Sequence, residues 1–319
     1  SYEQINDNNI YELLTNRISG YKLDHNNSHI LEYICLRLSN ECDFLKNKSL
    51  NIKFNNKTIL GAALSFLDQF DKNYYDILVD IINDNRLHIY NVETEDKKTS
   101  FTTIDDNNKT NIVLYTDNTI TGIIDLVHET IHGVGIANAK NIYKASDASK
   151  NLCEVGSIFM ESLTKDYLLE ALDNYDEIEL CNKQKHNSVM IGTLKYLYEI
   201  KLLDLFEEYG EIDKDNCISY LKKFFPEYSD IQIKDDLKYM LMIDSDINIT
   251  ARLIIGNIIA AKTLNDYQKN SDKTLIKIKA LIYNIENMDL KDASELLDIS
   301  FKKEDIDDYI DLYIKNNTY

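Results

Sequence analysis

Residues 111–135 read NIVLYTDNTITGIIDLVHETIHGVG, and this stretch decides what kind of fold the chain forms. Its first five residues are rich in β-branched and aromatic side chains, which predicts a short strand, and the Asp-Asn pair soon after them predicts a turn. Thr119 or Thr121 is then placed to cap a helix. Apolar residues recur along this helix: Ile123, Ile124, Val127, Ile131 and Val134. The stretch therefore indicates a fold that contains both strands and helices.

Polar residues form a neighbouring stripe on the same helix. His128 and His132 stand four residues apart, so their imidazoles lie on one face about one turn apart and can reach a single metal ion. Glu129 points toward the same site and can take a proton from water on that metal. Two surface or capping histidines are the plain alternative, but that reading leaves Glu129 and the spacing as coincidence. Beyond the stripe, we expect Gly133 and Gly135 to weaken the helix and let the chain turn away.

A catalytic zinc ion needs a third protein ligand and one open position for water. Residues 151–172 have a helical period, and we place Glu154 at the beginning of that helix, where the positive end of the helix dipole favours a carboxylate. Glu161 lies about two turns further along nearly the same face. Either residue alone is explained equally well as a solvated carboxylate. A histidine pair that needs a partner makes Glu154 the better candidate ligand.

The motif and its downstream glutamate resemble the gluzincins, the thermolysin-like clan of zinc metallopeptidases. In that clan the third ligand is a glutamate on a second helix, often within the pattern Asn-Glu-x-x-Ser-Asp. Glu154, which follows the second histidine by 22 residues, and Ser157 match the Glu and the Ser of this pattern. Cys153 replaces the Asn, and Ile158 replaces the Asp. The resemblance covers residues 111–172 and extends to small, uncharacterised bacterial members of the clan.

The Asp that is missing from the pattern orients a ligand histidine in the clan by hydrogen bonding its outer nitrogen. Either Glu161 or Asp125 substitutes for it in this chain, or the site is tuned differently. The missing residue also supports a different class of function, a zincin-fold binding or regulatory protein whose metal is structural or absent. A further alternative is a protease similar to the clostridial neurotoxin light chains, which carry the same His-Glu-x-x-His arrangement with the third glutamate further from the motif.

The gluzincin resemblance implies a zinc-dependent metalloendopeptidase. His128, His132 and Glu154 would hold Zn²⁺, the expected cofactor, with a water in the fourth position. Glu129, which is not a ligand, would accept a proton from that water and pass it to the leaving amine. The strand that precedes the metal-site helix would offer an edge to the extended backbone of a peptide or protein substrate.

The clan also implies a histidine or tyrosine from the downstream helical part that stabilises the oxyanion of the tetrahedral intermediate. His186 is the first choice for this catalytic role, because residues 185–188 read as the opening of a new helix. Tyr196 and Tyr198 are the next choices. An exposed residue at a helix start is the plain alternative for His186.

Length and periodicity predict an α+β fold that is predominantly helical and zincin-like. A chain of 319 residues is long enough for two lobes. We expect residues 1–140 to form an N-terminal lobe with helices, a small antiparallel sheet and the metal-site helix, and residues 141–319 to form a helical C-terminal lobe that supplies the third ligand. Strands are expected at 86–92, 99–104 and 111–116, joined as an antiparallel meander. Other helices are expected at 27–46, 58–84, 151–172, 187–209, 214–224, 230–242, 249–266, 272–286, 289–297 and 302–315.

The chain is strongly acidic, with 54 Asp and Glu against 35 Lys and Arg and a formal net charge of −19. Such a surface repels phosphate backbones, which argues against a nucleic-acid partner, and it would steer a basic peptide toward the site. We expect no signal peptide, because the first residues contain neither the basic nor the apolar segment of one, and no membrane partner, because no apolar run approaches the length of a membrane span. The five scattered cysteines are typical of reduced thiols, and we expect a cytoplasmic protein unless a signal has been removed.

Overall fold

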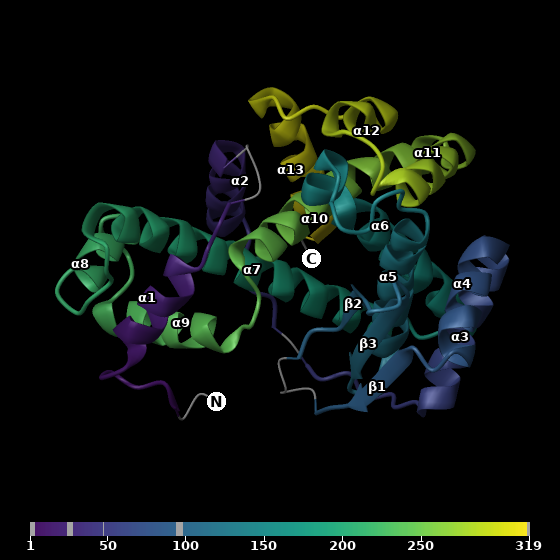
Figure 1. The fold of residues 1–319 in the computed structure, drawn as a ribbon, viewed down its shortest axis with the longest axis horizontal. Helices are drawn as coiled ribbons and strands as arrows, with labels where there is room; N and C mark the ends of the chain where they lie inside the picture. The colour runs from purple at the N-terminus through teal and green to yellow at the C-terminus, as the bar shows by residue number, and fades with distance from the viewer. Residues whose placement is uncertain (1–3, 24–27, 47, 94–97, 318–319) are drawn as a thin grey trace. The chain divides into compact units, whose positions relative to one another are not determined.

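The computed structural model describes residues 4–23, 28–46, 48–93 and 98–317 (Figure 1). Most of these residues are helical, and the described residues also form one small sheet. The prediction of a predominantly helical fold with a small sheet is therefore confirmed. In chain order the elements are α1 (Ile10–Ser19), α2 (Ser28–Glu41), α3 (Asn56–Phe70), α4 (Lys72–Asn83), β1 (Leu87–Asn91), β2 (Phe101–Ile104), β3 (Thr110–Thr116), α5 (Ile120–Ala137), α6 (Asp147–Leu172), α7 (Tyr175–Tyr209), α8 (Cys217–Lys222), α9 (Asp230–Met242), α10 (Ile247–Lys269), α11 (Ser271–Asn284), α12 (Leu290–Leu297) and α13 (Lys303–Asn317).

Two compact units share the chain, and each is made of two stretches of sequence. The first contains Ser1–Glu41 and Met190–Ile254, and the second contains Cys42–Val189 and Ile255–Tyr319. Helices α7 and α10 pass from one unit into the other. Residue 140 lies inside the second unit, so the predicted lobe boundary does not coincide with this division. The whole sheet and helix α5, which carries the histidine pair, belong to the second unit.

The strands of the sheet run in the order β1-β3-β2, with β3 in the centre. β2 pairs with β3 antiparallel, but β1 pairs with β3 in parallel, so the predicted antiparallel meander is wrong. Alternate side chains of β3 are buried, Ile112 and Leu114 completely, and a strand that is buried in this way needs hydrogen-bond partners on both sides. The strand that precedes α5 is therefore not the edge that we expected, and β1 and β2 are the outer strands.

Helix α5 packs against α3, α4, α6, α11 and the sheet (Figure 1). Thr119, one of the two predicted caps, accepts a hydrogen bond of 3.3 Å from the backbone N–H two residues further on. The helix continues through Gly133 and Gly135 to Ala137, so the expected exit at the glycines is wrong. Their missing side chains allow close packing instead, since a Cβ at Gly135 would lie 2.9 Å from Ile285 Cγ2.

Several helix boundaries differ from those predicted. The expected helix 58–84 is two helices, because Asp71 adopts an extended backbone that ends α3, and its carboxylate then caps α4. Helix α7 begins at Tyr175 and not at residue 187. No helix was predicted at the position of α1, although Ile10, Leu14 and Ile18 recur there at a helical spacing. The remaining helices begin within a few residues of the predicted positions.

Helix α10 has the length and composition to cross a membrane, but 67% of its apolar window is buried inside the protein, as in a core helix. None of the five cysteines is joined to another in a disulfide. Three of them, Cys35, Cys181 and Cys217, are buried.

Close helix packing in the second unit predicts that two glycine substitutions change the free energy of unfolding in opposite directions. A Cβ at Gly156 of α6 would lie 2.6 Å from Ile282 Cγ1 of α11, whereas nothing lies within 4 Å of a Cβ at Gly61 of α3. Gly156→Ala should lower the free energy of unfolding by ~1–3 kcal/mol, because the added methyl overpacks the contact. Gly61→Ala should raise it by up to ~1 kcal/mol, because alanine favours the helix. Urea titration followed by circular dichroism measures both, and equal effects would contradict this packing.

Candidate metal centre

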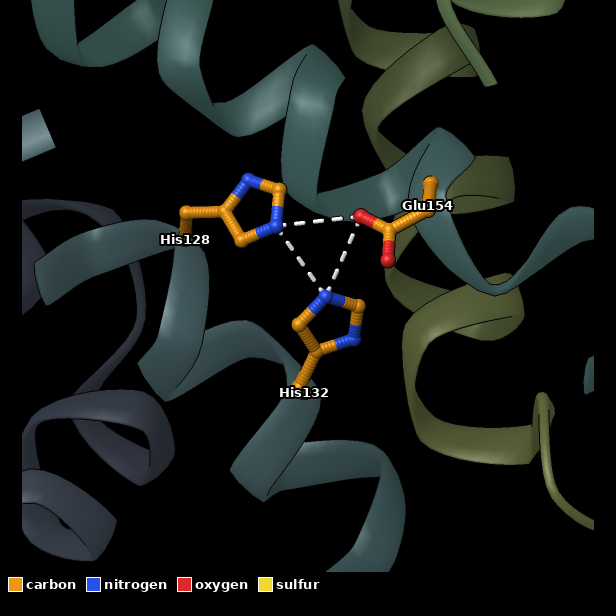
Figure 2. A group of neighbouring side chains, drawn as sticks. All are labelled: His128, His132 and Glu154. Atoms are coloured by element: carbon orange, nitrogen blue, oxygen red, sulfur yellow. Dashed lines mark hydrogen bonds and ion pairs between the residues drawn. The ribbon is translucent and has the colours of Figure 1, made fainter. Parts of the chain in front are cut away.

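Two helices bring three metal-binding side chains together. His128 and His132 come from α5, and Glu154 comes from α6, which packs along α5. Figure 2 shows both imidazoles and the carboxylate turned toward one another. His128 Nε2 lies 3.1 Å from His132 Nε2 and 3.0 Å from Glu154 Oε2, and His132 Nε2 lies 3.2 Å from the same oxygen. The structure therefore brings together the three residues that were predicted as ligands.

These distances fit the ligands of a tetrahedral metal ion. Ligand atoms about 2.0–2.1 Å from one ion, at tetrahedral angles, stand ~3.3–3.4 Å from one another. The observed separations of 3.0–3.2 Å are slightly shorter. Two nitrogens and a carboxylate oxygen, with one position left over, suit a divalent metal ion that keeps an open site. No other such group of His, Cys, Asp and Glu occurs among the residues that the structure describes.

Glu154 lies in the interior of its helix. Because α6 begins at Asp147, capped by Ser146, the predicted position of Glu154 at the helix start is wrong, and so is its stabilisation by the helix dipole. Packing places this carboxylate instead, since α10 approaches so closely that a Cβ at Gly256 would lie 2.7 Å from Glu154 Cβ. The buried Ser157 Oγ lies 3.4 Å from Glu154 Oε2. Neighbouring helix backbone and a hydroxyl group thus hold the carboxylate beside the histidines.

Glu161 takes the position for which the sequence left two candidates. Its Oε1 lies 2.9 Å from Nδ1 of His128, the ring nitrogen that faces none of the other ligand atoms. Asp125 instead accepts a hydrogen bond of 2.8 Å from Lys185 Nζ, and the same ammonium lies 3.5 Å from Glu161 Oε1. A carboxylate on the outer nitrogen fixes the orientation and the tautomer of a ligand imidazole. Glu161, and not Asp125, therefore contacts the outer nitrogen of His128.

The charged groups of this centre shift one another's pKa values. Burial lowers the pKa of His128, but hydrogen bonds to Glu154 and Glu161 and their negative charges hold that pKa well above its usual range. Burial also opposes protonation of His132, yet Glu154 raises the pKa of this residue as well. Burial raises the pKa of Glu161, whereas Lys185 and His128 bring it down to about 2. The metal-free imidazoles therefore hold their protons more tightly than ordinary histidines do.

Glu129, the predicted general base, lies on α5 beside the ligands and is not one of the three converging groups. Its side chain is buried, and its Oε2 accepts a hydrogen bond of 2.6 Å from Thr102 Oγ1 on β2. Thr102 and Lys185 contact the centre although no sequence pattern pointed to a role for them. A polar residue at a strand position that faces the helices is the one signal that marks Thr102.

His186 lies in the interior of α7, so the helix start predicted at 185–188 is wrong. The residue is 2% exposed, its Nε2 donates to the carbonyl of Asp43 at 3.2 Å, and its Nδ1 lies 2.9 Å from the Tyr313 hydroxyl, which donates to it. Burial lowers the pKa of His186 and keeps the ring neutral. Both nitrogens are engaged, so the geometry gives the predicted oxyanion role no support. Tyr196 and Tyr198 are buried in the first unit.

No family model matches this chain, and no curated protein matches its sequence. Its fold is similar to that of a protein assigned as oligoendopeptidase F from Bacillus anthracis strain Ames, with a TM-score of 0.65 and 12% identity over 96% of this chain and 59% of the other. PZ peptidase A, solved with an inhibitor, gives a TM-score of 0.65 and 11% identity over 96% of this chain and 60% of the other. A protein assigned as a peptidase from Chlamydophila abortus gives a TM-score of 0.58 and 14% identity over 99% of this chain and 55% of the other.

These similarities show a shared fold. At identities of 11–14% they do not by themselves transfer activity or residue roles. The chain also spans only 55–60% of the length of the three proteins.

The contact between Glu161 and His128 predicts weaker metal binding when the charge on Glu161 is removed. Glu161→Gln keeps the size of the side chain but replaces a charge-assisted acceptor by a neutral amide, so the affinity for Zn²⁺ should fall ~10–100-fold. Glu170→Gln, an exposed position on the same helix, is the matched control and should bind Zn²⁺ as the wild type does. Competition with a chromophoric chelator measures both. Equal affinities in the two variants would show that Glu161 does not support the ligand.

The raised pKa values of the two histidines predict that metal binding releases protons. A metal ion competes with the proton for Nε2, so the apparent affinity is full above these pKa values and falls as the pH drops through them. Titration calorimetry of Zn²⁺ binding at neutral pH, in two buffers of different ionisation enthalpy, measures the protons released. Equal heats in both buffers would mean that the imidazoles were already neutral.

Proposed function

We propose that this chain is a zinc-dependent metalloendopeptidase with a gluzincin-like site. One observation carries the proposal: His128, His132 and Glu154 converge, while the carboxylate of Glu129, on the same helix, stays outside the group. Three ligands and a separate carboxylate are what hydrolysis by an activated water requires. The fold shared with PZ peptidase A and with a protein assigned as oligoendopeptidase F supports the same class of reaction.

Zinc is the metal that this donor set favours. Imidazole nitrogens with one carboxylate oxygen at nearly tetrahedral separations are typical of catalytic zinc sites, whereas magnesium and calcium prefer six or more oxygen ligands. When bound, zinc supplies Lewis-acid chemistry, because it lowers the pKa of a water in its open position to about 7 and polarises the scissile carbonyl.

The side chains of the protein supply the rest of the chemistry. Glu161 holds the His128 ring so that Nε2 is directed toward the other two ligand atoms. Glu129 accepts a proton from the attacking water and delivers it to the leaving amine. Lys185 lies between the carboxylates of Asp125 and Glu161 and balances part of their charge, which keeps Glu161 ionised. Orientation, proton transfer and charge balance are thus divided among different residues.

We propose a peptide or protein substrate that binds in an extended form. Within the described part of the chain β2 is an outer strand and places Thr102 against Glu129, so the outer edge of β2, and not β3, would offer the strand edge for a substrate backbone beside the site. The net charge of −19 would attract basic peptides over a long range.

The alternative of a binding or regulatory protein, with a structural metal or none, depended mainly on the missing Asp at Ile158. Glu161 makes the contact that this Asp would make, so the alternative loses that support. A structural zinc site is also closed by four protein ligands, whereas three side chains converge in the described part of this chain. The open position favours catalysis.

The mechanism predicts that Glu129→Gln separates metal binding from catalysis. The amide cannot accept a proton, so turnover of a quenched-fluorescent peptide library should fall ~10²–10⁴-fold. Zinc content, measured by atomic absorption, should equal that of the wild type, because Glu129 is not a ligand. Glu154→Gln is the contrasting variant and should lose zinc and turnover together. Retained turnover in Glu129→Gln, or zinc-loaded wild type that cleaves no peptide, would overturn the proposal.

A further inference from the structure

A hydroxyl group from the sheet holds the proposed general base. Thr102 Oγ1 lies 2.6 Å from Glu129 Oε2 and 3.0 Å from the Glu129 carbonyl oxygen. A hydroxyl has one proton, and the shorter contact is the one to the carboxylate. An O–H···O⁻ bond of this length is charge-assisted and stronger than a neutral hydrogen bond.

Strand pairing places this hydroxyl with precision. Thr102 stands opposite Ile112 of the central strand β3, and Ile112 is completely buried on the face that packs against α5. Since side chains alternate along a strand, Thr102 shares that face, while Thr103 points to the other one and is exposed. β2 is an outer strand, so the contact from Thr102 to Glu129 joins the rim of the sheet to the metal-site helix.

A carboxylate base works only when one oxygen is held where the proton is transferred, and free rotation about its terminal bond would spread that oxygen over many positions. The Thr102 hydroxyl engages Oε2. That contact leaves Oε1 as the carboxylate oxygen that is available to accept a proton. The contact therefore selects one orientation of Glu129 out of those that the side chain would otherwise adopt.

We propose that Thr102 is a positioning residue that acts through Glu129 and sets the orientation of the general base. This inference rests on the proposed peptidase function. Removing the hydroxyl should leave the zinc ligands intact and should slow the proton-transfer step. Turnover should fall while substrate affinity changes little.

Three variants test this role. Thr102→Val removes the hydroxyl at nearly constant shape and suits a strand, so kcat should fall ~10–100-fold, as for other residues that orient a catalytic group, with KM and zinc content near those of the wild type. Thr102→Ser restores the hydroxyl and should recover most of kcat. Thr103→Val, on the opposite face of the same strand, is the matched control and should leave the zinc content and the orientation of Glu129 as in the wild type. If Thr102→Val does not fold, Thr102→Ala takes its place.

Crystal structures of the zinc-loaded variants give a readout that does not depend on turnover. The Glu129 carboxylate should keep one orientation in the wild type and in Thr102→Ser, and it should rotate or become disordered in Thr102→Val. An unchanged Glu129 in Thr102→Val, or a loss of kcat that Ser does not restore, would overturn the inference. If the wild type cleaves no peptide, the proposed function fails, and the orientation of Glu129 alone decides the role of Thr102.

Discussion

Two imidazoles and one carboxylate meet between α5 and α6, and the packing of the second unit holds the two helices that carry them. Taking such groups out of water is costly unless each finds an opposite charge or a metal ion. His128 and His132 both lie within 3.2 Å of Glu154 Oε2, so the same atoms form ion pairs when protonated and a ligand set when a metal displaces the protons. The three side chains can be held together only if the surrounding helices pack closely, and Gly156 of α6 and Gly256 of α10 permit this packing.

Support for the reactive groups comes from several elements at once. Glu161 on α6 orients His128, Lys185 on α7 lies between Glu161 and Asp125, and Thr102 on β2 holds Glu129. Each contact is a hydrogen bond or ion pair that fixes the direction of a side chain, and small errors in direction reduce catalysis strongly. The sheet therefore contributes to the site although it provides no metal ligand.

Local patterns predicted most helices and the positions of the strands, because helical and strand periods are properties of neighbouring residues. Strand order was wrong, since the same alternation in β1, β2 and β3 is compatible with more than one arrangement. The glycines of α5 were misread as the end of the helix because glycine weakens an isolated helix. In the structure they lie inside the helix, and the lack of a side chain there leaves room for Ile285 and neighbouring groups. His186 was placed at a helix start, but α7 begins at Tyr175, just after Asn174, whose side chain accepts a hydrogen bond from the backbone N–H of Glu177.

The sequence by itself determined which side chains carry the proposed chemistry. Helical geometry sets His128 and His132 one turn apart whatever surrounds them, and the need of the pair for a third ligand, together with the resemblance to the gluzincins, pointed to Glu154. Only the tertiary structure decided between Glu161 and Asp125 and revealed Lys185 and Thr102. These contacts join elements that are far apart in the chain, and their geometry depends on how helices and strands pack, which no local pattern encodes.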